Sequence, residues 1–227
     1  MQIKTRGIVL SFIKYKESSI IAKLYTEELG AVSCIVNSVR SVKSRSNKIA
    51  LYQALTLLDL VIYYRPNQNL HRISEAKMAY PYHSIPFDIG KSSIALFLTE
   101  ILGKVLKEEE KNEELFEFML DNFQTFDELS EGYSNFHLKF LIQLAEFLGF
   151  GIFSVSNFVE ELHLTTVNEK SLVFFANLLH TEFHHTISAN REIRHEVLTW
   201  LIHFYKIHFE NFGGIKSLEV LKEVLSD

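Results

Sequence analysis

The sequence predicts an α+β multidomain fold, in which an N-terminal β-barrel (residues 1–80) precedes an all-α helical domain (residues 81–227). Three observations predict this division. In residues 6–77, short segments of alternating apolar and polar residues are separated by turn-forming residues, as in strands. After residue 88 the apolar residues recur at the spacing of a helix face. The charge divides at the same place, because residues 1–80 hold 12 Lys and Arg against 5 Asp and Glu, whereas the remaining residues hold 11 against 23.

We expect five strands in the first part, over residues 7–14, 20–26, 31–38, 54–64 and 70–76. The run Glu-Glu-Leu-Gly at residues 27–30 predicts a tight hairpin connection, in which Gly30 can take a positive φ. Pro66 has no backbone N–H and places residues 65–69 in a loop. Five strands with no long helix between them fit a small closed barrel, and the OB-fold is a common barrel of this kind that binds nucleic acid.

Pro81 and Pro86 mark the boundary between the two parts, over residues 81–88. The first helix expected after it has one apolar face, made of Ile94, Phe97, Leu98, Ile101, Leu102, Val105 and Leu106. The second follows the acid-rich run 107–114 and buries Leu115, Phe116, Met119, Leu120 and Phe123. The third covers residues 134–148, with Phe147 among its inward residues and Gly149 or Gly151 at its end.

The pattern is weaker over residues 150–186, where we expect a short helix at 172–185 and either loops or short strands at 165–167. Ser188 is then the predicted N-cap of a long helix that ends at Gly213 and Gly214 and buries Ile193, Val197, Trp200, Leu201, Phe204 and Ile207. A last helix is expected at residues 217–225. No internal repeat or low-complexity tract is found in this part.

The composition indicates a folded, cytoplasmic protein with no membrane segment. Of the 227 residues, 47% are hydrophobic, yet no apolar run approaches the roughly 20 residues that span a bilayer. The N-terminal residues lack the order of a signal peptide. Cys34 is the one cysteine, which rules out an intramolecular disulfide and a multi-cysteine zinc site; it is expected to be a small buried residue.

The loop between the third and fourth strands is the main candidate site. Four cations, Arg40, Lys43, Arg45 and Lys48, fall within nine residues without a carboxylate, among Ser and Asn side chains. Charged residues in loops commonly have no role beyond contact with solvent. Here, however, residues 1–80 as a whole carry a net positive charge. Because Lys and Arg bind phosphates, this loop is predicted to contact nucleic acid, with Lys14, Lys16 and Arg6 extending the surface.

Aromatic residues of the barrel are candidates for stacking on bases. Tyr15 is favoured among them, because it lies between Lys14 and Lys16 at a strand end. The other candidates are Phe12, Tyr25, Tyr52, Tyr63 and Tyr64, of which Phe12 and Tyr25 are equally expected to be core or barrel-face residues.

The sequence does not indicate an enzyme. It contains no G-x-S-x-G, G-x-G-x-x-G or Walker-type motif. His180, His184 and His185 include an i, i+4 pair, but the run His-Thr-Glu-Phe-His-His does not have the H-E-x-x-H spacing of zinc peptidases. We expect ordinary surface histidines here, with a metal-dependent hydrolase as the alternative.

The order of several segments resembles the RecO family of bacterial recombination mediator and DNA repair proteins. The matching segments are residues 5–10 (Thr-Arg-Gly-Ile-Val-Leu), 15–19, 24–30, Val39 and Arg40 with Ser44, 55–64, 70–76, 140–150 with its Leu-Gly-Phe, and 215–218. They cover essentially the whole chain, and their order and spacing, rather than one motif, carry the resemblance.

The resemblance implies an N-terminal OB-fold, a C-terminal helical domain, DNA binding and strand annealing without nucleotide hydrolysis. It also implies partnership with RecR and with the single-stranded DNA-binding protein SSB, and help in loading the RecA recombinase onto SSB-coated strands. Many members carry a four-cysteine zinc motif after the Leu-Gly-Phe segment. Residues 152–164 contain no cysteine, so we expect no zinc and no other cofactor; Ser38 also replaces the usual glycine before Val39 and Arg40.

We therefore predict a DNA repair and homologous recombination mediator that binds single- and double-stranded DNA through Arg40, Lys43, Arg45, Lys48, Lys14, Lys16 and Arg6, with Tyr15 as a stacking group. The alternative is an OB-fold scaffold for protein interaction that does not bind nucleic acid.

Overall fold

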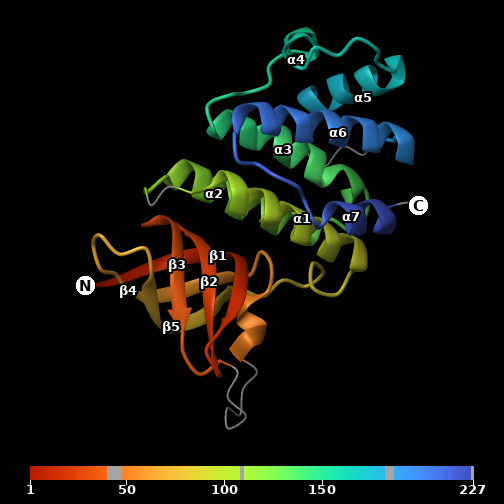
Figure 1. Cartoon of the computed structure of the whole chain (residues 1–227). Coiled ribbons are helices and arrows are strands. Elements are labelled where there is room, and N and C mark those ends of the chain that lie inside the picture. The colour runs from red at the N-terminus through yellow and green to blue at the C-terminus, as the bar shows by residue number, and fades with distance from the viewer. Residues whose placement is uncertain (40–47, 108–109, 182–186, 226–227) are drawn as a thin grey trace.

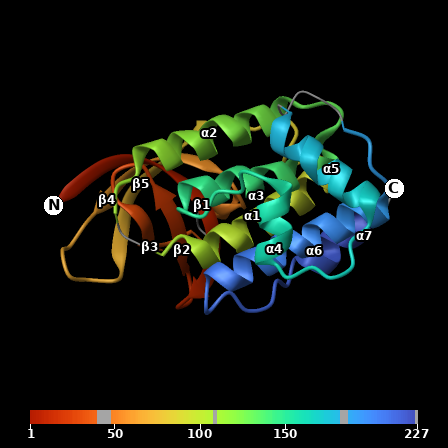
Figure 2. The ribbon, with the colours of Figure 1, turned by 90° about the horizontal axis from the view of Figure 1, so that it is seen from above.

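The computed structural model describes residues 1–39, 48–107, 110–181 and 187–225. A β-barrel forms the N-terminal part, and a layered group of helices lies against one end of it (Figures 1 and 2). The predicted α+β fold, with a barrel followed by a helical domain, is confirmed. Among the described residues, no helix is both long enough and apolar enough to cross a membrane.

Five strands close the barrel in the order β1-β2-β3-β5-β4. They are β1 (Gln2–Tyr15), β2 (Ser19–Thr26), β3 (Gly30–Val36), β4 (Leu57–Tyr63) and β5 (His71–Tyr80). Strands β3 and β5 pair in parallel and the other pairs are antiparallel, which is the arrangement of an OB-fold. A 3-10 helix, η1 (Lys48–Tyr52), connects β3 to β4.

Strand β1 closes the barrel because it pairs with both of its neighbours. Its first half pairs with β4 and its second half with β2, and Gly7 belongs to both ladders. A Cβ atom at Gly7 would lie 2.7 Å from Leu60 Cδ1, so a larger residue here would require the Leu60 side chain to move. A register shift between Val9 and Ser11 then bends the strand. The strand therefore begins five residues before the predicted start.

The other strand predictions are correct in number and order but differ at their ends. Strand β3 stops at Val36, because Ser38 has a φ of 60° that a strand does not accommodate. Strand β4 begins at Leu57 rather than at residue 54, because Leu55 has a φ of 64°. Strand β5 continues to Tyr80, four residues beyond the prediction, because its ladder with β4 extends to the pair Leu57 and Tyr80.

The helical domain contains seven α-helices among the described residues: α1 (Ile89–Val105), α2 (Glu113–Glu128), α3 (Phe136–Phe147), α4 (Val155–Glu161), α5 (Glu169–His180), α6 (Arg191–His208) and α7 (Leu218–Val224). A short 3-10 helix, η2 (Tyr133–Asn135), precedes α3. Asparagine and aspartate side chains accept backbone N–H bonds at the first turn of α1, α2, α5 and α6, through Asp88, Asn112, Asn168 and Asn190.

The apolar faces predicted for α1 and α2 are buried as expected, but several C-terminal predictions were wrong. The N-cap of α6 is Asn190 rather than Ser188, and the helix ends at His208, before the two glycines. Residues 165–167 lie in a loop, which is one of the two alternatives expected for them, whereas α4 was not predicted. Phe147 and Ile207 were expected to be inward, yet both are exposed in the last turn of their helices, although Phe147 stacks on Phe118 of α2 with ring centroids 4.5 Å apart.

Aromatic rings pack the segment after α3 against the helices that follow it. Phe150 stacks on His208 with ring centroids 4.2 Å apart, and Phe158 stacks on Phe175 at 4.4 Å. Nε2 of His208 also lies 2.7 Å from a carboxylate oxygen of Glu161 in α4. Apolar burial therefore fixes α4 against α5 and α6.

The barrel has its own apolar core, and a second, larger core is shared between barrel and helices. The barrel core includes Val9, Cys34 and Tyr52. The shared core joins Ile8 and Tyr25 of the barrel to α1, α2, α3, α5, α6 and α7. The two parts are therefore packed against each other through buried apolar side chains.

Candidate nucleic-acid interface

The predicted cations Lys14 and Lys16 lie at the turn between β1 and β2, with Tyr15 between them. Tyr15 pairs with Ser19 across this turn, and Lys16 takes a positive φ of 48°. The ammonium of Lys16 lies 5.3 Å from the centroid of the Tyr15 ring, which is a cation–π contact. Lys14 and Lys16 are exposed and have no carboxylate partner among the described residues. Their charge is thus available to a ligand.

The basic loop begins beside this turn. Ser19 Oγ lies 3.2 Å from Oδ1 of Asn37, just after β3, and buried Val39 anchors the start of the loop in the barrel core. Lys48 is exposed at the start of η1, which buried Tyr52 anchors in the same core. Figure 1 shows η1 and the β1–β2 turn at the end of the barrel that points away from the helices.

The structure thus brings four of the predicted residues to one end of the barrel: Lys14, Tyr15, Lys16 and Lys48. Arg40, Lys43 and Arg45 lie outside the described residues. Their predicted contact with phosphates therefore stays a prediction.

Arg6 lies elsewhere and is bound to carboxylates. Its guanidinium donates to both carboxylate oxygens of Glu27, at 2.9 and 2.8 Å, and also to Glu117 in α2. The hydrogen bond to Glu27 raises the pKa of Arg6, and the same bond lowers the pKa of Glu27. The guanidinium also lies 5.2 Å from the centroid of Phe116. Arg6 therefore connects the barrel to α2 and is not grouped with the other predicted cations.

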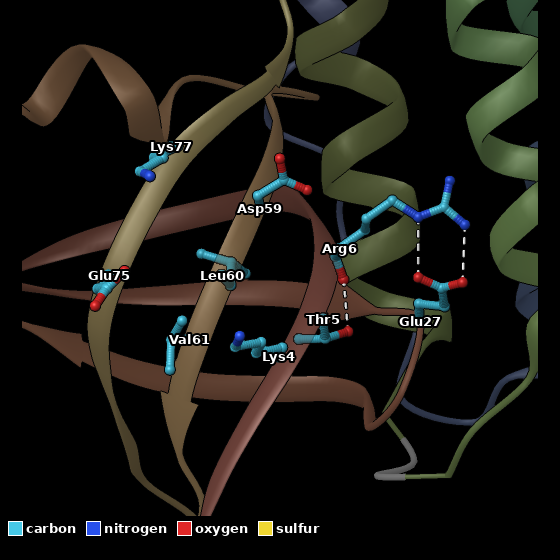
Figure 3. A pocket seen from close by; sticks show the side chains of 9 residues that line it. All are labelled: Lys4, Thr5, Arg6, Glu27, Asp59, Leu60, Val61, Glu75 and Lys77. Carbon is cyan, nitrogen blue, oxygen red and sulfur yellow. Dashed lines mark hydrogen bonds and ion pairs between the residues drawn. The ribbon is translucent and has the colours of Figure 1, made fainter.

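A cavity of about 450 Å³ beside Arg6 has a mixed lining (Figure 3). Its cations are Lys4, Arg6 and Lys77, and its carboxylates are Glu27, Asp59 and Glu75. Opposite charges in equal number make this surface a poor site for a polyanion. The charged end of the barrel is the better candidate.

Lys23 is another barrel cation that faces the helices. Its ammonium donates to the backbone carbonyl of Gly103 in α1, and burial lowers its pKa, with a smaller contribution from Lys107. Together with Arg6 it fixes the helical domain on the barrel. The cations near the helices are thus used internally, whereas those at the far end are free of such bonds among the described residues.

The candidate stacking residues separate into buried and accessible rings. Tyr25 and Tyr52 are buried, and burial raises the pKa of Tyr25 to about 12. The ring of Tyr64 packs on His71 with centroids 4.5 Å apart. Tyr63 is 43% exposed. Tyr63 therefore has an accessible ring on the barrel wall, in addition to Tyr15 at the turn.

Sequence reasoning missed a second cavity, of about 690 Å³, that Tyr63 and Tyr64 line together with Arg65 and Arg72. The signal was the run Tyr-Tyr-Arg at residues 63–65 before a turn. Its significance depends on Arg72, which the β4–β5 hairpin pairs with Tyr63, and on Ile35, which the parallel pairing of β3 with β5 brings to the same cavity.

The C-terminal histidines give no support to a metal-dependent site. His180 ends α5, and His184 and His185 lie outside the described residues. Over the described ranges, no group of three or more His, Cys, Asp or Glu side chains is placed to hold a metal ion.

The fold and this site define an OB-fold protein with a basic barrel end and an appended helical domain. The family model described as "Recombination protein O N terminal" matches residues 1–82, and "Recombination protein O C terminal" matches residues 86–155. The DNA repair protein RecO of Phocaeicola vulgatus is 36% identical over 98% of this chain and 99% of its own length. The protein of the same name from Flavobacterium psychrophilum is 37% identical over 100% of both chains. That from Bacteroides fragilis is 35% identical over 97% of this chain and 98% of its own length.

The chain belongs to the RecO family of DNA repair proteins, which confirms the predicted family.

Proposed function

We propose that the chain is a non-catalytic, cytoplasmic mediator of DNA repair and homologous recombination that binds single- and double-stranded DNA at the basic end of its barrel. The observation that carries the proposal is the grouping of Lys14, Lys16 and Lys48 at this end, beside the flanks of the loop with Arg40, Lys43 and Arg45. Lys14, Lys16 and Lys48, with the predicted contribution of Arg40, Lys43 and Arg45, suit a polyanion, because binding releases the counterions of the phosphates.

The barrel is basic and the helical domain is acidic, and this difference supports one orientation of DNA. The helical domain is acidic and lies at the opposite end of the barrel from the lysines. Like charge repels a nucleic acid from the helical side. DNA is therefore directed to the barrel end, which leaves the helical domain free for protein contacts.

This arrangement suits strand annealing and recombinase loading. A basic surface lowers the repulsion between two complementary strands, so it helps them to pair without nucleotide hydrolysis. We propose that the partners are RecR and SSB, and that the protein helps RecA to assemble on SSB-coated strands. We infer these partners from the resemblance to the family and from the proposed division of roles between the barrel and the helical domain.

The test is the salt dependence of DNA affinity, measured by fluorescence anisotropy with labelled oligonucleotides. Replacing Lys14, Lys16 and Lys48 together by Ala should weaken binding and reduce the slope of log K against log salt by about 2 on single strands and about 3 on duplex. The triple replacement of Arg40, Lys43 and Arg45 should act similarly.

The matched control is Lys4→Ala with Lys77→Ala, which removes two exposed barrel cations from the mixed-charge cavity. The control should change the slope much less than either triple variant. If the triple variants bind DNA with the affinity and slope of the unmodified protein, the barrel end is not the site. Binding of the unmodified protein only at very low salt would favour the scaffold alternative.

A further inference from the structure

One row of paired residues crosses the outer face of the barrel between the β1–β2 turn and the second cavity. Ile13 pairs with Ile21, Ile21 with Ile35, Ile35 with Arg72, and Arg72 with Tyr63. Directly paired residues in a sheet lie on the same face. The row therefore crosses all five strands and spans about 19 Å, given about 4.8 Å between neighbouring strands.

The row is exposed although three of its members are apolar. Ile13 is 63% exposed and Tyr63 43%, whereas Ile21 and Ile35 are partly exposed. In Figure 1, β2 and β3 form the near face of the barrel, and the helices lie against its other end. Because the row takes one residue from each strand of a closed barrel, it winds around the barrel, and its exposed side chains are accessible from outside along that path.

The second cavity lies at the end of this row. Ile35, Arg72 and Tyr63 belong both to the row and to the lining of the cavity of about 690 Å³. The loop between β4 and β5 forms the rest of the lining, with Arg65 and Gln68. The cavity is thus bounded by a ring, by two guanidinium groups and by apolar side chains.

The charge of this cavity is of one sign. Arg65 and Arg72 are exposed, neither is in an ion pair among the described residues, and none of the side chains that line the cavity is a carboxylate. Tyr64 is not free to act with them, since its ring packs on His71. Tyr63 is therefore the ring that a ligand would meet, between two sources of positive charge.

We propose that this cavity takes an unpaired base of single-stranded DNA, with the base stacked on Tyr63 and the neighbouring phosphates bound by Arg65 and Arg72. The strand then runs along the row of isoleucines toward Lys14 and Lys16. This inference rests on the proposed function and extends it, because it assigns a site selective for single strands. A duplex keeps its bases paired and stacked, so it can use the phosphate contacts but not the ring.

The test compares single-stranded and duplex DNA in variants of Tyr63. Tyr63→Leu should weaken binding of a single-stranded oligonucleotide by about 5- to 100-fold, the effect of losing one stacked base, while duplex affinity stays within about twofold. Tyr63→Phe keeps the ring and should bind both as the unmodified protein does. An oligonucleotide that contains 2-aminopurine reports stacking directly, because its fluorescence is quenched by stacking in the unmodified protein and should recover with Tyr63→Leu.

Arg72→Gln is a second variant, which keeps the test valid if Tyr63→Leu does not fold. It should make the single-strand salt slope shallower by about 0.7. Lys77→Gln, at another exposed position of β5, is its control and should not change the slope to this extent.

Three results would overturn the proposal while leaving the basic end as a DNA site. The first is that Tyr63→Leu weakens single-strand and duplex binding equally. The second is that none of these variants changes the affinity for DNA. The third is that Tyr63→Phe and Tyr63→Leu weaken single-strand binding equally. Failure of the unmodified protein to bind DNA at all would instead contradict the proposed function.

Discussion

His137 has no role at the proposed site, but it makes the stability of the protein depend on pH. It lies buried in α3, and its ring packs edge-on against Phe97 with centroids 5.9 Å apart. Burial lowers its pKa to about 3, and the charges of Arg194 and His195 add to this effect. The folded protein therefore keeps His137 neutral at pH values where an unfolded chain would protonate it.

The first prediction is a loss of stability below about pH 6.5. The unfolded state binds one more proton at this position than the folded state between about pH 6.5 and pH 3, so the contribution is complete above pH 6.5 and falls by about 1.4 kcal/mol per pH unit below it. Urea unfolding of the unmodified protein and of His137→Phe at several pH values measures it. The difference in unfolding free energy between the two should shift in favour of the variant as the pH falls. A difference independent of pH would show that His137 is not held neutral.

At the scale of elements, the linker between barrel and helices is organised by the C-terminal part of α2. The carboxylate of Asp127 accepts backbone N–H bonds from His83, Ser84 and Ile85, at 2.7 to 2.9 Å. Burial is the largest single influence on the pKa of Asp127 and raises it. The hydrogen bonds together outweigh burial, so the pKa of Asp127 is lowered. The ammonium of Lys91 donates to the backbone carbonyl of Asp127 at 2.9 Å and to Ser84.

Replacing Asp127 by Ala is expected to lower the free energy of unfolding by about 3 kcal/mol. The substitution leaves three backbone N–H groups of the linker without their acceptor; Ile85 is buried and Ser84 is half-buried, whereas His83 is exposed. Chemical denaturation measures the change. Asp121→Ala in the same helix is the control, because Asp121 is exposed and should change stability by less than about 0.5 kcal/mol. Similar effects of the two variants would refute the role of Asp127.

Local patterns were sufficient for most elements, and tertiary contacts explain the failures. The i, i+3, i+4 spacing of Ile94, Phe97 and Leu98 predicted α1 because its buried face is continuous. The spacing was less reliable in the last turn of a helix, where Phe147 stacks on Phe118 but stays 36% exposed and Ile207 is 47% exposed. Helix α4 was missed because its seven residues bury mainly Phe158, too few for a periodic pattern.

The candidate site was predictable only in part for a similar reason. Lys14, Tyr15 and Lys16 are adjacent in sequence, so their grouping was visible. Nothing local distinguished Arg6 from them, because its partners Glu27 and Glu117 are 21 and 111 residues away. In the cavity at Tyr63, the β4–β5 hairpin brings Arg72 beside Tyr63, whereas Ile35 reaches the cavity only through the parallel pairing of β3 with β5.

At the scale of the whole molecule, the cations have two separate uses. Arg6 and Lys23, which face the helical domain, bind its carboxylate and carbonyl groups and hold the two parts together over their shared apolar core. Lys14, Lys16 and Lys48, at the other end, have no carboxylate partner among the described residues. The excess positive charge of the barrel is therefore concentrated where the helices do not reach.

This distribution leads to the central claim that the barrel end binds DNA while the helical domain contacts proteins. The most direct measurement is fluorescence anisotropy of a labelled single-stranded oligonucleotide, titrated with the unmodified protein at several salt concentrations, with and without saturating SSB. We predict binding that weakens steeply as salt rises and that persists when SSB covers the strand. No binding at low salt, or an affinity that does not change with salt, would contradict the claim and return the basic loop to the status of a solvated connection.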